Sequence, residues 1–315
     1  MGLPRIRVLA MGGTIAGAAG SATDATGYRA GTTPIDDVLG QVPLDGLAEV
    51  TGEQFAQIDS SNLTEQLMLG LARRVLELAN DDSVDGVVVT HGTDSLEESA
   101  YFLHLTVASS KPIVLVGSMR PPTALSPDGP MNIYAAVAVA ASEAARDKGV
   151  LVVMNDEIHT ARDVTKSSSL RVDAFESPYG PLGTVIAGEP RFYRSLDHRP
   201  APLPIPARLP TSTIIYAHTG LDAVVTPHDV VVFAGFGNGT VPARMIDPLL
   251  ASGALIVRAT RTGSGHVTLV GASEARANDW VAVDDQNPQR ARILACLALT
   301  VTRDPAEIQA IFHRS

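Results

Sequence analysis

The sequence predicts an α/β fold with two α/β domains: a larger N-terminal domain with a mainly parallel sheet and a smaller C-terminal domain. Short, β-branched apolar runs alternate with helical patterns along the chain, as they do in βαβ units. A proline-rich stretch separates this alternation into two parts. The length of 315 residues also suits about two domains, at roughly 150 residues each.

Each expected strand is a short apolar run. The expected strands cover residues 6–10, 85–90, 112–116, 150–154, 213–217 and 230–234. In the strands at 85–90, 112–116 and 150–154 the apolar residues are continuous rather than alternating, which is typical of strands covered on both faces. We therefore expect the sheet to be largely parallel.

The expected helices lie between these strands. Leucine and valine recur from Leu63 to Leu78 at spacings of three and four, which places them on one stripe of a helix. Asn62, with Glu65 three residues later, fits the N-cap of that helix. Further helices are expected over residues 132–147, 242–252 and 287–301.

The segment from Arg194 to Pro210 interrupts the alternation. It contains prolines at positions 200, 202, 204, 206 and 210, and prolines at this density favour an extended, semi-rigid spacer. We therefore expect an N-terminal domain over residues 1–193, a linker over 194–211 and a C-terminal domain over 212–315.

The composition argues against several classes of partner. A net charge of −10 is the opposite of the basic surface that favours nucleic acid or an anionic membrane. No apolar stretch approaches the roughly 20 residues of a membrane span. The single cysteine, Cys296, lies in an apolar run and allows no internal disulfide and no cysteine-rich metal site. We expect it to be a small buried hydrophobe.

No secretory leader is expected, because the first ten residues carry Arg5 and Arg7 at the first strand and no apolar region precedes it. This predicts a soluble, cytoplasmic chain, although a mature periplasmic form beginning with a new Met1 would look the same. The histidines, including His104 and His159, lack the spacing of metal ligands. No metal site is therefore expected.

The stretch MGGTIAG, Met11 to Gly17, directly follows the first expected strand. Its paired glycines allow a sharp turn and the close approach of another group. Two nucleotide-binding interpretations fail here. A dinucleotide fingerprint needs glycine where Thr14 stands, and a P-loop needs lysine where Ala18 stands.

A second loop repeats this arrangement. In VVVTHGTDSLEES, Val87 to Ser99, a buried strand again leads through a glycine to a threonine, Thr93, and Asp94 with Glu97 has capping-box spacing. In a parallel sheet both loops lie at the carboxyl ends of strands, where ligand sites form. Two hydroxyls near helix N-terminal N–H groups suit acyl transfer. Two capped turns with incidental threonines are the alternative.

A threonine hydroxyl needs a base to become a strong nucleophile. Lys166 lies in the polar loop ARDVTKSSSLRVDAF, after the expected strand at 150–154. A lysine held beside a hydroxyl and a carboxylate can accept a proton, because burial lowers the pKa of lysines. The alternative is a solvated surface charge.

Several motifs resemble, in their order along the chain, the signatures of bacterial-type L-asparaginases. They are MGGTIAG, THGTDSLEESA, MND with ARDVTK, FESPYGPLG, GFGNGT and the closing NPQRARILACLALTVTRDPAEIQAIF. The resemblance implies hydrolysis of L-asparagine to L-aspartate and ammonia through a threonine nucleophile and an acyl-enzyme, without metal or cofactor. It also implies a homotetramer built from intimate dimers, with each active site between two subunits.

The resemblance implies a catalytic role for five residues. Thr14 would be the nucleophile, assisted by Tyr28 on a mobile loop. Thr93, Asp94 and Lys166 would form a second group of hydroxyl, carboxylate and amine. The backbone N–H of Thr93 would face the oxyanion.

The resemblance also implies how a zwitterionic amino acid is held. Ser60 would bind the α-carboxylate of the substrate, and Asp94 would bind its α-ammonium group. Ser61, Gly92 and Thr93 complete the expected substrate-binding set within the N-terminal domain.

The chain departs from the family at a few positions. Many relatives carry Gln or Glu where Ser61 stands, and many carry a second Asn where Thr240 stands. Glu274 is the nearest counterpart of the glutamate that a partner subunit contributes, but it is offset. His91 is expected to support the second loop. The departures leave the preference between asparagine and glutamine open.

Three alternative functions stand beside the leading one. A mixed asparaginase-glutaminase would use both amides. A non-catalytic amino-acid-binding sensor on the same fold is disfavoured, because all five expected catalytic residues are present. An amidotransferase subunit that supplies ammonia to a charged tRNA carries an extra N-terminal domain, whereas the first strand here begins at residue 5.

Overall fold

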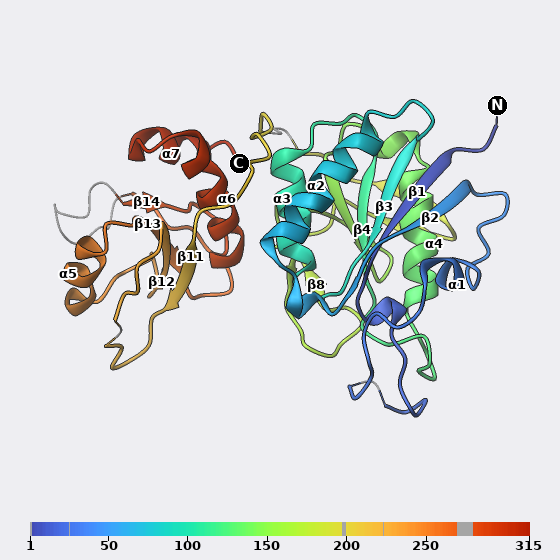
Figure 1. Cartoon of the computed structure of the whole chain (residues 1–315), viewed down its shortest axis with the longest axis horizontal. Helices are drawn as coiled ribbons and strands as arrows, with labels where there is room; N and C mark the ends of the chain where they lie inside the picture. Colours follow the sequence, from blue (N-terminus) through green and yellow to red (C-terminus); the bar gives the residue numbers. More distant parts are fainter. Residues whose placement is uncertain (1, 25, 197–199, 223, 270–279) are drawn as a thin grey trace. The chain divides into compact units, whose positions relative to one another are not determined.

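The computed structural model describes residues 2–24, 26–196, 200–222, 224–269 and 280–315 (Figure 1). The chain divides into two compact units, Met1–Asp197 and His198–Ser315. Both units are α/β, with a mainly parallel sheet in the first and a smaller parallel sheet in the second, which confirms the predicted fold class. The domain limits and the linker over 194–211 stay predictions.

The first unit contains a sheet with the strand order β10-β9-β6-β5-β4-β3-β1-β2. Its strands are β1 (Arg5–Gly12), β2 (Glu49–Ile58), β3 (Gly86–Thr90), β4 (Ile113–Val116), β5 (Val150–Met154), β6 (Glu157–Thr160), β9 (Gly183–Ile186) and β10 (Glu189–Phe192). From β5 to β2 the neighbours pair in parallel, and from β5 to β10 they pair antiparallel. A separate pair joins β7 (Thr165–Lys166) to β8 (Phe175–Glu176).

Helices cover both faces of this sheet. They are α1 (Ile35–Leu39), α2 (Glu65–Ala79), α3 (Leu96–Thr106) and α4 (Gly129–Ala140), with single 3-10 turns at Thr14–Ala16, Ser60–Asn62 and Glu143–Ala145. Helices α2 and α3 lie on one face, and α1 and α4 lie on the other (Figure 1). The α1 and α4 side chains share a buried cluster with alternate residues of the central strands, such as Val88 and Val114. Because the intervening strand residues are buried as well, those strands are apolar without interruption.

Each strand expected from the sequence is present, with ends that differ by no more than two residues. Strand β2 is not predicted, because it lies at the edge of the sheet and its residues are largely exposed or half-buried. Edge strands lack the continuous apolar run that identifies the central ones.

Two helix starts differ from the prediction. The N-cap of α2 is Thr64, whose Oγ1 accepts a 3.3 Å hydrogen bond from the N–H of Leu67. Asn62 lies instead in a 3-10 turn capped by Asp59, so the chain makes one tight turn before the helix begins. Helix α4 begins at Gly129, three residues before the expected start, because Pro130 suits a first helical turn. It ends at Ala140, well before residue 147.

The second unit has a parallel sheet in the order β11-β12-β13-β14. Its elements are β11 (Ser212–Tyr216), β12 (Val230–Gly235), α5 (Ala243–Ala251), β13 (Leu255–Thr260), β14 (Val281–Ala282), α6 (Pro288–Val301) and α7 (Pro305–Phe312). Cys296 is buried in α6, as predicted. Among the helices described in either unit, none combines the length and apolar composition that a membrane crossing requires.

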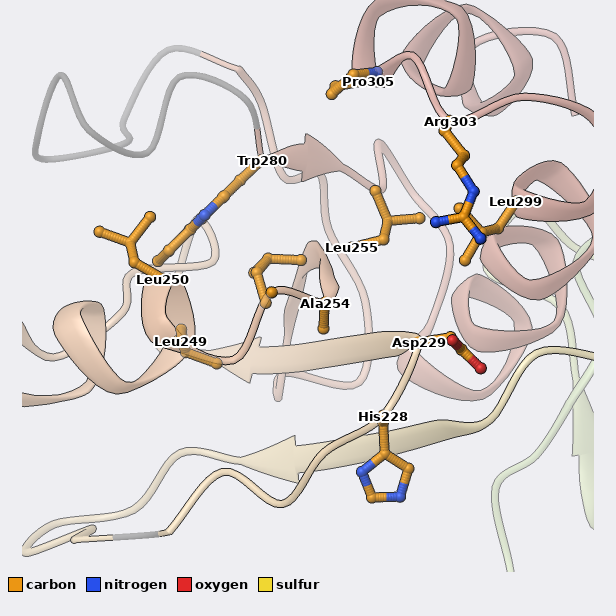
Figure 2. Close-up of a pocket in the computed structure, with 12 residues that line it drawn as sticks. His228, Asp229, Leu249, Leu250, Ala254, Leu255, Trp280, Leu299, Arg303 and Pro305 are labelled. Atoms are coloured by element: carbon orange, nitrogen blue, oxygen red, sulfur yellow. The ribbon is translucent and has the colours of Figure 1, made fainter.

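An open pocket lies where β12 and β13 begin (Figure 2). Apolar side chains such as Leu249 and Trp280 line part of it, and His228, Asp229 and Arg303 add polar groups. Ligand sites of parallel sheets form at the other, carboxyl ends of the strands. None of the described candidate residues lines this pocket.

His159 on β6 is buried without a charge. Its side chain is 1% exposed, and its Nε2 lies 3.2 Å from Glu157 Oε2, while its Nδ1 lies 3.0 Å from the Ser177 hydroxyl. Burial lowers the pKa of His159 to about 4 and raises the pKa of Glu157. At neutral pH the histidine is therefore uncharged, and its contact with Glu157 is not an ion pair.

We expect His159 to make the protein less stable in mild acid. The unfolded histidine takes up a proton near pH 6.5, whereas the folded one does so only near pH 4, so stability falls as the pH drops between these values. This group alone should remove about 2 kcal/mol of unfolding free energy between about pH 7.5 and about pH 5. Urea unfolding at both pH values tests this, because His159→Gln should show the smaller pH dependence. An equal dependence in both proteins would contradict it.

Candidate active site

Three neighbouring parallel strands end at the same edge of the large sheet. Strand β1 leads into Gly13 and Thr14, β3 leads into Gly92 and Thr93, and β2 leads into Ser60. Because β1 lies between β2 and β3 and is parallel to both, the three segments leave the sheet side by side. The two threonine loops expected from the sequence thus meet at one place.

Glycines let these segments touch. Gly13 has φ +81°, and a Cβ at this position would lie 2.3 Å from the Cα of Gly92. A Cβ at Gly92 would lie 2.5 Å from the hydroxyl oxygen of Ser60. No side chain fits into either gap. The glycines of MGGTIAG therefore serve close packing of backbone against backbone rather than a phosphate.

The hydroxyl of Thr14 has a phenol as its partner. Thr14 is 5% exposed, and its Oγ1 lies 2.5 Å from the hydroxyl oxygen of Tyr28. Ala18 and Arg29 exchange two backbone hydrogen bonds, of 3.0 and 2.9 Å. These bonds hold Arg29, and with it the neighbouring Tyr28, beside the Thr14 loop.

The hydroxyl of Thr93 has an amine as its partner. Lys166 Nζ donates to Thr93 Oγ1 over 2.9 Å and to Asp94 Oδ1 over 2.6 Å. The lysine side chain is 18% exposed, whereas the Asp94 side chain is 59% exposed. The structure therefore brings together the three residues that the sequence analysis grouped, and one carboxylate among them faces solvent.

The predicted capping box at the start of α3 is wrong. The helix begins at Leu96, its N-cap is Ser95, and no side chain caps it. The Asp94 carboxylate instead accepts from the amine of Lys166, and Glu97 Oε2 accepts from the Lys166 backbone N–H over 2.9 Å. Both carboxylates thus bind Lys166, which is distant in the sequence, and neither caps the helix as their spacing indicated.

Ser60 and Ser61 have different environments. Ser60 is 4% exposed, its Oγ accepts the Asp94 N–H at 3.2 Å, and its carbonyl accepts the Ser95 hydroxyl at 2.7 Å. Ser61 is exposed, and its hydroxyl donates to Asp59 Oδ1 at 2.8 Å. The sequence analysis missed Ser95, because a serine beside a helix start is an ordinary cap. Glu274 lies outside the described residues.

The side chain of His91 supports the loop that carries Thr93. It is 1% exposed, its Nδ1–H donates to the carbonyl of Gly92 at 2.7 Å, and its Nε2 accepts from the Ser99 hydroxyl at 2.9 Å. Burial lowers the pKa of His91, so the ring is neutral at pH 7. Within the described ranges, no group of three or more His, Cys, Asp or Glu residues could hold a metal ion.

Comparisons with known proteins agree with each other over the whole chain. The family model described as "Asparaginase, N-terminal" matches residues 5–198, and that of the "Glutaminase/Asparaginase C-terminal domain" matches residues 213–312. The chain is 43% identical to the glutaminase-asparaginase of Pseudomonas aeruginosa, covering 98% of this chain and 90% of that protein. It is 39% identical to L-asparaginase 2 of Escherichia coli, covering 100% of this chain and 94% of that protein.

A solved structure is similar as well. The crystal structure of the probable cytoplasmic L-asparaginase from Campylobacter jejuni superposes with a TM-score of 0.94 at 41% sequence identity. The match covers 99% of this chain and 100% of that one.

The contact between Gly13 and Gly92 yields a stability prediction. Gly13→Ala should lower the unfolding free energy by more than about 3 kcal/mol, because it combines an overlap with backbone atoms and a positive φ. Gly20→Ala is the matched control, since no atom lies within 4 Å of a Cβ there, and it should change stability by less than about 0.5 kcal/mol. Urea unfolding measures both, and equal stabilities of the two variants would refute the packing argument.

Proposed function

Because the chain belongs to the asparaginase family, we propose that it is an L-asparaginase, hydrolysing L-asparagine to L-aspartate and ammonia. One observation carries the proposal. Two buried threonine hydroxyls stand at adjacent strand ends, and each has its own proton-handling partner: a phenol for Thr14, and an amine with a carboxylate for Thr93. Amide hydrolysis needs such groups, because a hydroxyl must lose a proton as it attacks and the leaving nitrogen must gain one.

In the proposed reaction, Thr14 Oγ1 attacks the side-chain amide carbon of asparagine. Tyr28 is positioned to relay the Thr14 proton toward the amide nitrogen, the C–N bond breaks, and ammonia leaves from an acyl-enzyme ester. Water then adds to the ester carbon, which releases aspartate and returns the proton to Thr14. The backbone N–H of Thr93 would face the oxyanion of each tetrahedral intermediate. No metal or cofactor takes part in these steps.

Thr93, Asp94 and Lys166 would support proton transfer to and from the amide group. The Lys166 amine already donates to both partners, so a change in the charge of one of them is felt by the other two. This coupling suits a site that must move a proton twice in each turnover.

The substrate would be bound through its two charges. The buried Ser60 hydroxyl would donate to the α-carboxylate, and the exposed carboxylate of Asp94 would accept from the α-ammonium group. Gly92 and Thr93 directly precede Asp94 in the chain and would line the floor of the site. The Ser61 hydroxyl already donates to Asp59. We therefore expect Ser61 to contribute to substrate binding through its backbone, or through a side chain smaller than the Gln or Glu that many relatives carry there.

A mixed asparaginase-glutaminase is the second candidate. Relatives at 43% identity carry that name, and Ser61 leaves more room than the longer residue that the family resemblance implies. Ammonia release from L-asparagine, L-glutamine and D-asparagine separates the candidates by kcat/KM. An L-asparaginase releases ammonia chiefly from L-asparagine, a mixed enzyme uses both L-amides at comparable kcat/KM, and an amino-acid-binding sensor releases none.

The assembly and the compartment are also proposals. We expect a homotetramer of intimate dimers in the cytoplasm, without nucleic-acid or membrane partners. The similar Campylobacter jejuni structure is titled as a probable cytoplasmic L-asparaginase, whereas a Haemophilus influenzae relative at 41% identity is named "Probable L-asparaginase periplasmic". Light scattering coupled to size-exclusion chromatography tests the assembly, and a dimer or monomer at assay concentration would contradict it.

Loss of the nucleophile should separate binding from turnover. Thr14→Ala removes the attacking oxygen but leaves Ser60 and Asp94, so L-aspartate should still bind while kcat falls by many orders of magnitude. Calorimetry and ammonia release measure the two effects. A folded variant that kept a tenth of the wild-type kcat would show that Thr14 is not the nucleophile.

Loss of the amine should slow the reaction without unfolding the protein. Lys166→Met should lower kcat by roughly 10²–10⁴-fold, the range expected for a group that assists proton transfer. Lys148→Met is the control, because Lys148 contacts the Phe192 ring and precedes the amino end of β5, whereas the threonine loops follow the carboxyl ends of the parallel strands. Its kcat should stay unchanged. Equal kcat values for the two variants would show that Lys166 does not assist proton transfer and is only a surface charge.

A further inference from the structure

Glu97 is a buried carboxylate that the proposed reaction does not use. It lies in the first turn of α3 and is 5% exposed. Its Oε2 accepts a 2.9 Å hydrogen bond from the backbone N–H of Lys166, which lies 69 positions further along the chain. A charged group is costly to bury unless hydrogen bonds compensate it. This bond therefore marks a specific contact between the helix and the segment that carries the lysine.

The backbone N–H of Lys166 finds its acceptor outside its own strand pair. Strand β7 is two residues long and pairs with the two-residue β8, outside the large sheet. Opposing residues of an antiparallel pair alternate between exchanging hydrogen bonds and not exchanging them. Ser167 donates its N–H to Ala174 at 2.7 Å, so Lys166, opposite Phe175, occupies the position that does not exchange bonds. The backbone N–H of Lys166 therefore points away from β8, and it donates to Glu97 Oε2 instead.

The same helix start carries the partners of the lysine amine. Thr93 and Asp94 lie just before Ser95, the N-cap of α3, and they accept from Lys166 Nζ. Glu97, one turn later, accepts from the backbone of the same lysine. Lys166 is thus held at both ends by a single segment, Thr93–Glu97.

We propose that Glu97 is a positioning residue that sets the place of the Lys166 amine beside Thr93 and Asp94 by holding the Lys166 backbone. The proposal rests on the proposed function for its kinetic consequence only. What Glu97 supplies is a hydrogen-bond acceptor at a fixed distance, not its charge. A glutamine can supply that acceptor, whereas an aspartate is one methylene too short to reach.

Three substitutions of Glu97 test this. Glu97→Ala should lower kcat by about 10- to 100-fold with KM within about threefold, because the amine is displaced while the substrate contacts remain. Glu97→Gln should stay within about threefold of the wild-type kcat, and Glu97→Asp should lie between Gln and Ala. Glu98→Ala is the matched control, since it removes the same charge from the same helical turn, and its kcat should be unchanged.

A second measurement does not depend on activity. The chain contains only three lysines, Lys111, Lys148 and Lys166, so trace acetylation with acetic anhydride can be followed at each by peptide mass spectrometry. In Glu97→Ala the Lys166 amine should acetylate at least about fivefold faster relative to the other two lysines, since it is no longer held against its acceptors. Glu97→Gln should leave this ratio unchanged.

The outcomes separate the two proposals. A changed acetylation ratio in a protein without asparaginase activity would support the positioning role and refute the proposed function. An unchanged ratio in folded Glu97→Ala, or a kcat for Glu97→Asp equal to or above that of Glu97→Gln, would overturn the positioning role. If Glu97→Ala does not fold, the kcat values of Glu97→Asp and Glu97→Gln decide by themselves whether Glu97 positions Lys166. Both variants keep a polar side chain at this position.

Discussion

The approach of the Gly13 and Gly92 backbones is the contact on which the site depends. These two residues follow adjacent parallel strands, and the gap between them is too small for any Cβ. Their contact sets how near the Thr14 loop stands to the Thr93 loop, and Gly92 in turn packs on Ser60. One steric condition thereby fixes the relative positions of both hydroxyls and of the serine expected to bind substrate.

The two threonines share this scaffold but differ in how their partners reach them. Tyr28 reaches Thr14 through a loop that is held by the backbone bonds between Ala18 and Arg29. Lys166 reaches Thr93 from a two-residue strand outside the large sheet. Each hydroxyl is therefore fixed at the end of a sheet strand, whereas each proton-handling partner comes from a segment outside the large sheet.

Burial divides the polar groups of the site by charge. The hydroxyls of Thr14, Thr93 and Ser60 are buried and hydrogen-bonded, and neutral groups tolerate this well. The carboxylate of Asp94 stays largely exposed although it is paired with Lys166. An exposed charge keeps much of its hydration until a ligand arrives, so it can accept an ammonium group at modest desolvation cost. The neutral ring of His91 completes the pattern beneath the loop.

The sequence alone determined the central strands, the main helices and the two threonine loops. Continuous apolar runs, helical spacing and glycines after strands are local signals, and each reports a burial or backbone requirement of its own segment. The motif order along the chain also indicated the family and, through it, the grouping of Thr93, Asp94 and Lys166.

Only the tertiary structure decided which partner each polar side chain takes. Asp94 and Glu97 have the spacing of a capping box, yet both bind Lys166, and Ser95 donates to Ser60 instead of capping α3. The edge strand β2 was hidden for a related reason, since its residues are exposed or half-buried and form no continuous apolar run. A side chain's best hydrogen-bond partner depends on what the fold brings within about 3 Å of it, and residues that lie 69 positions apart leave no local pattern in the sequence.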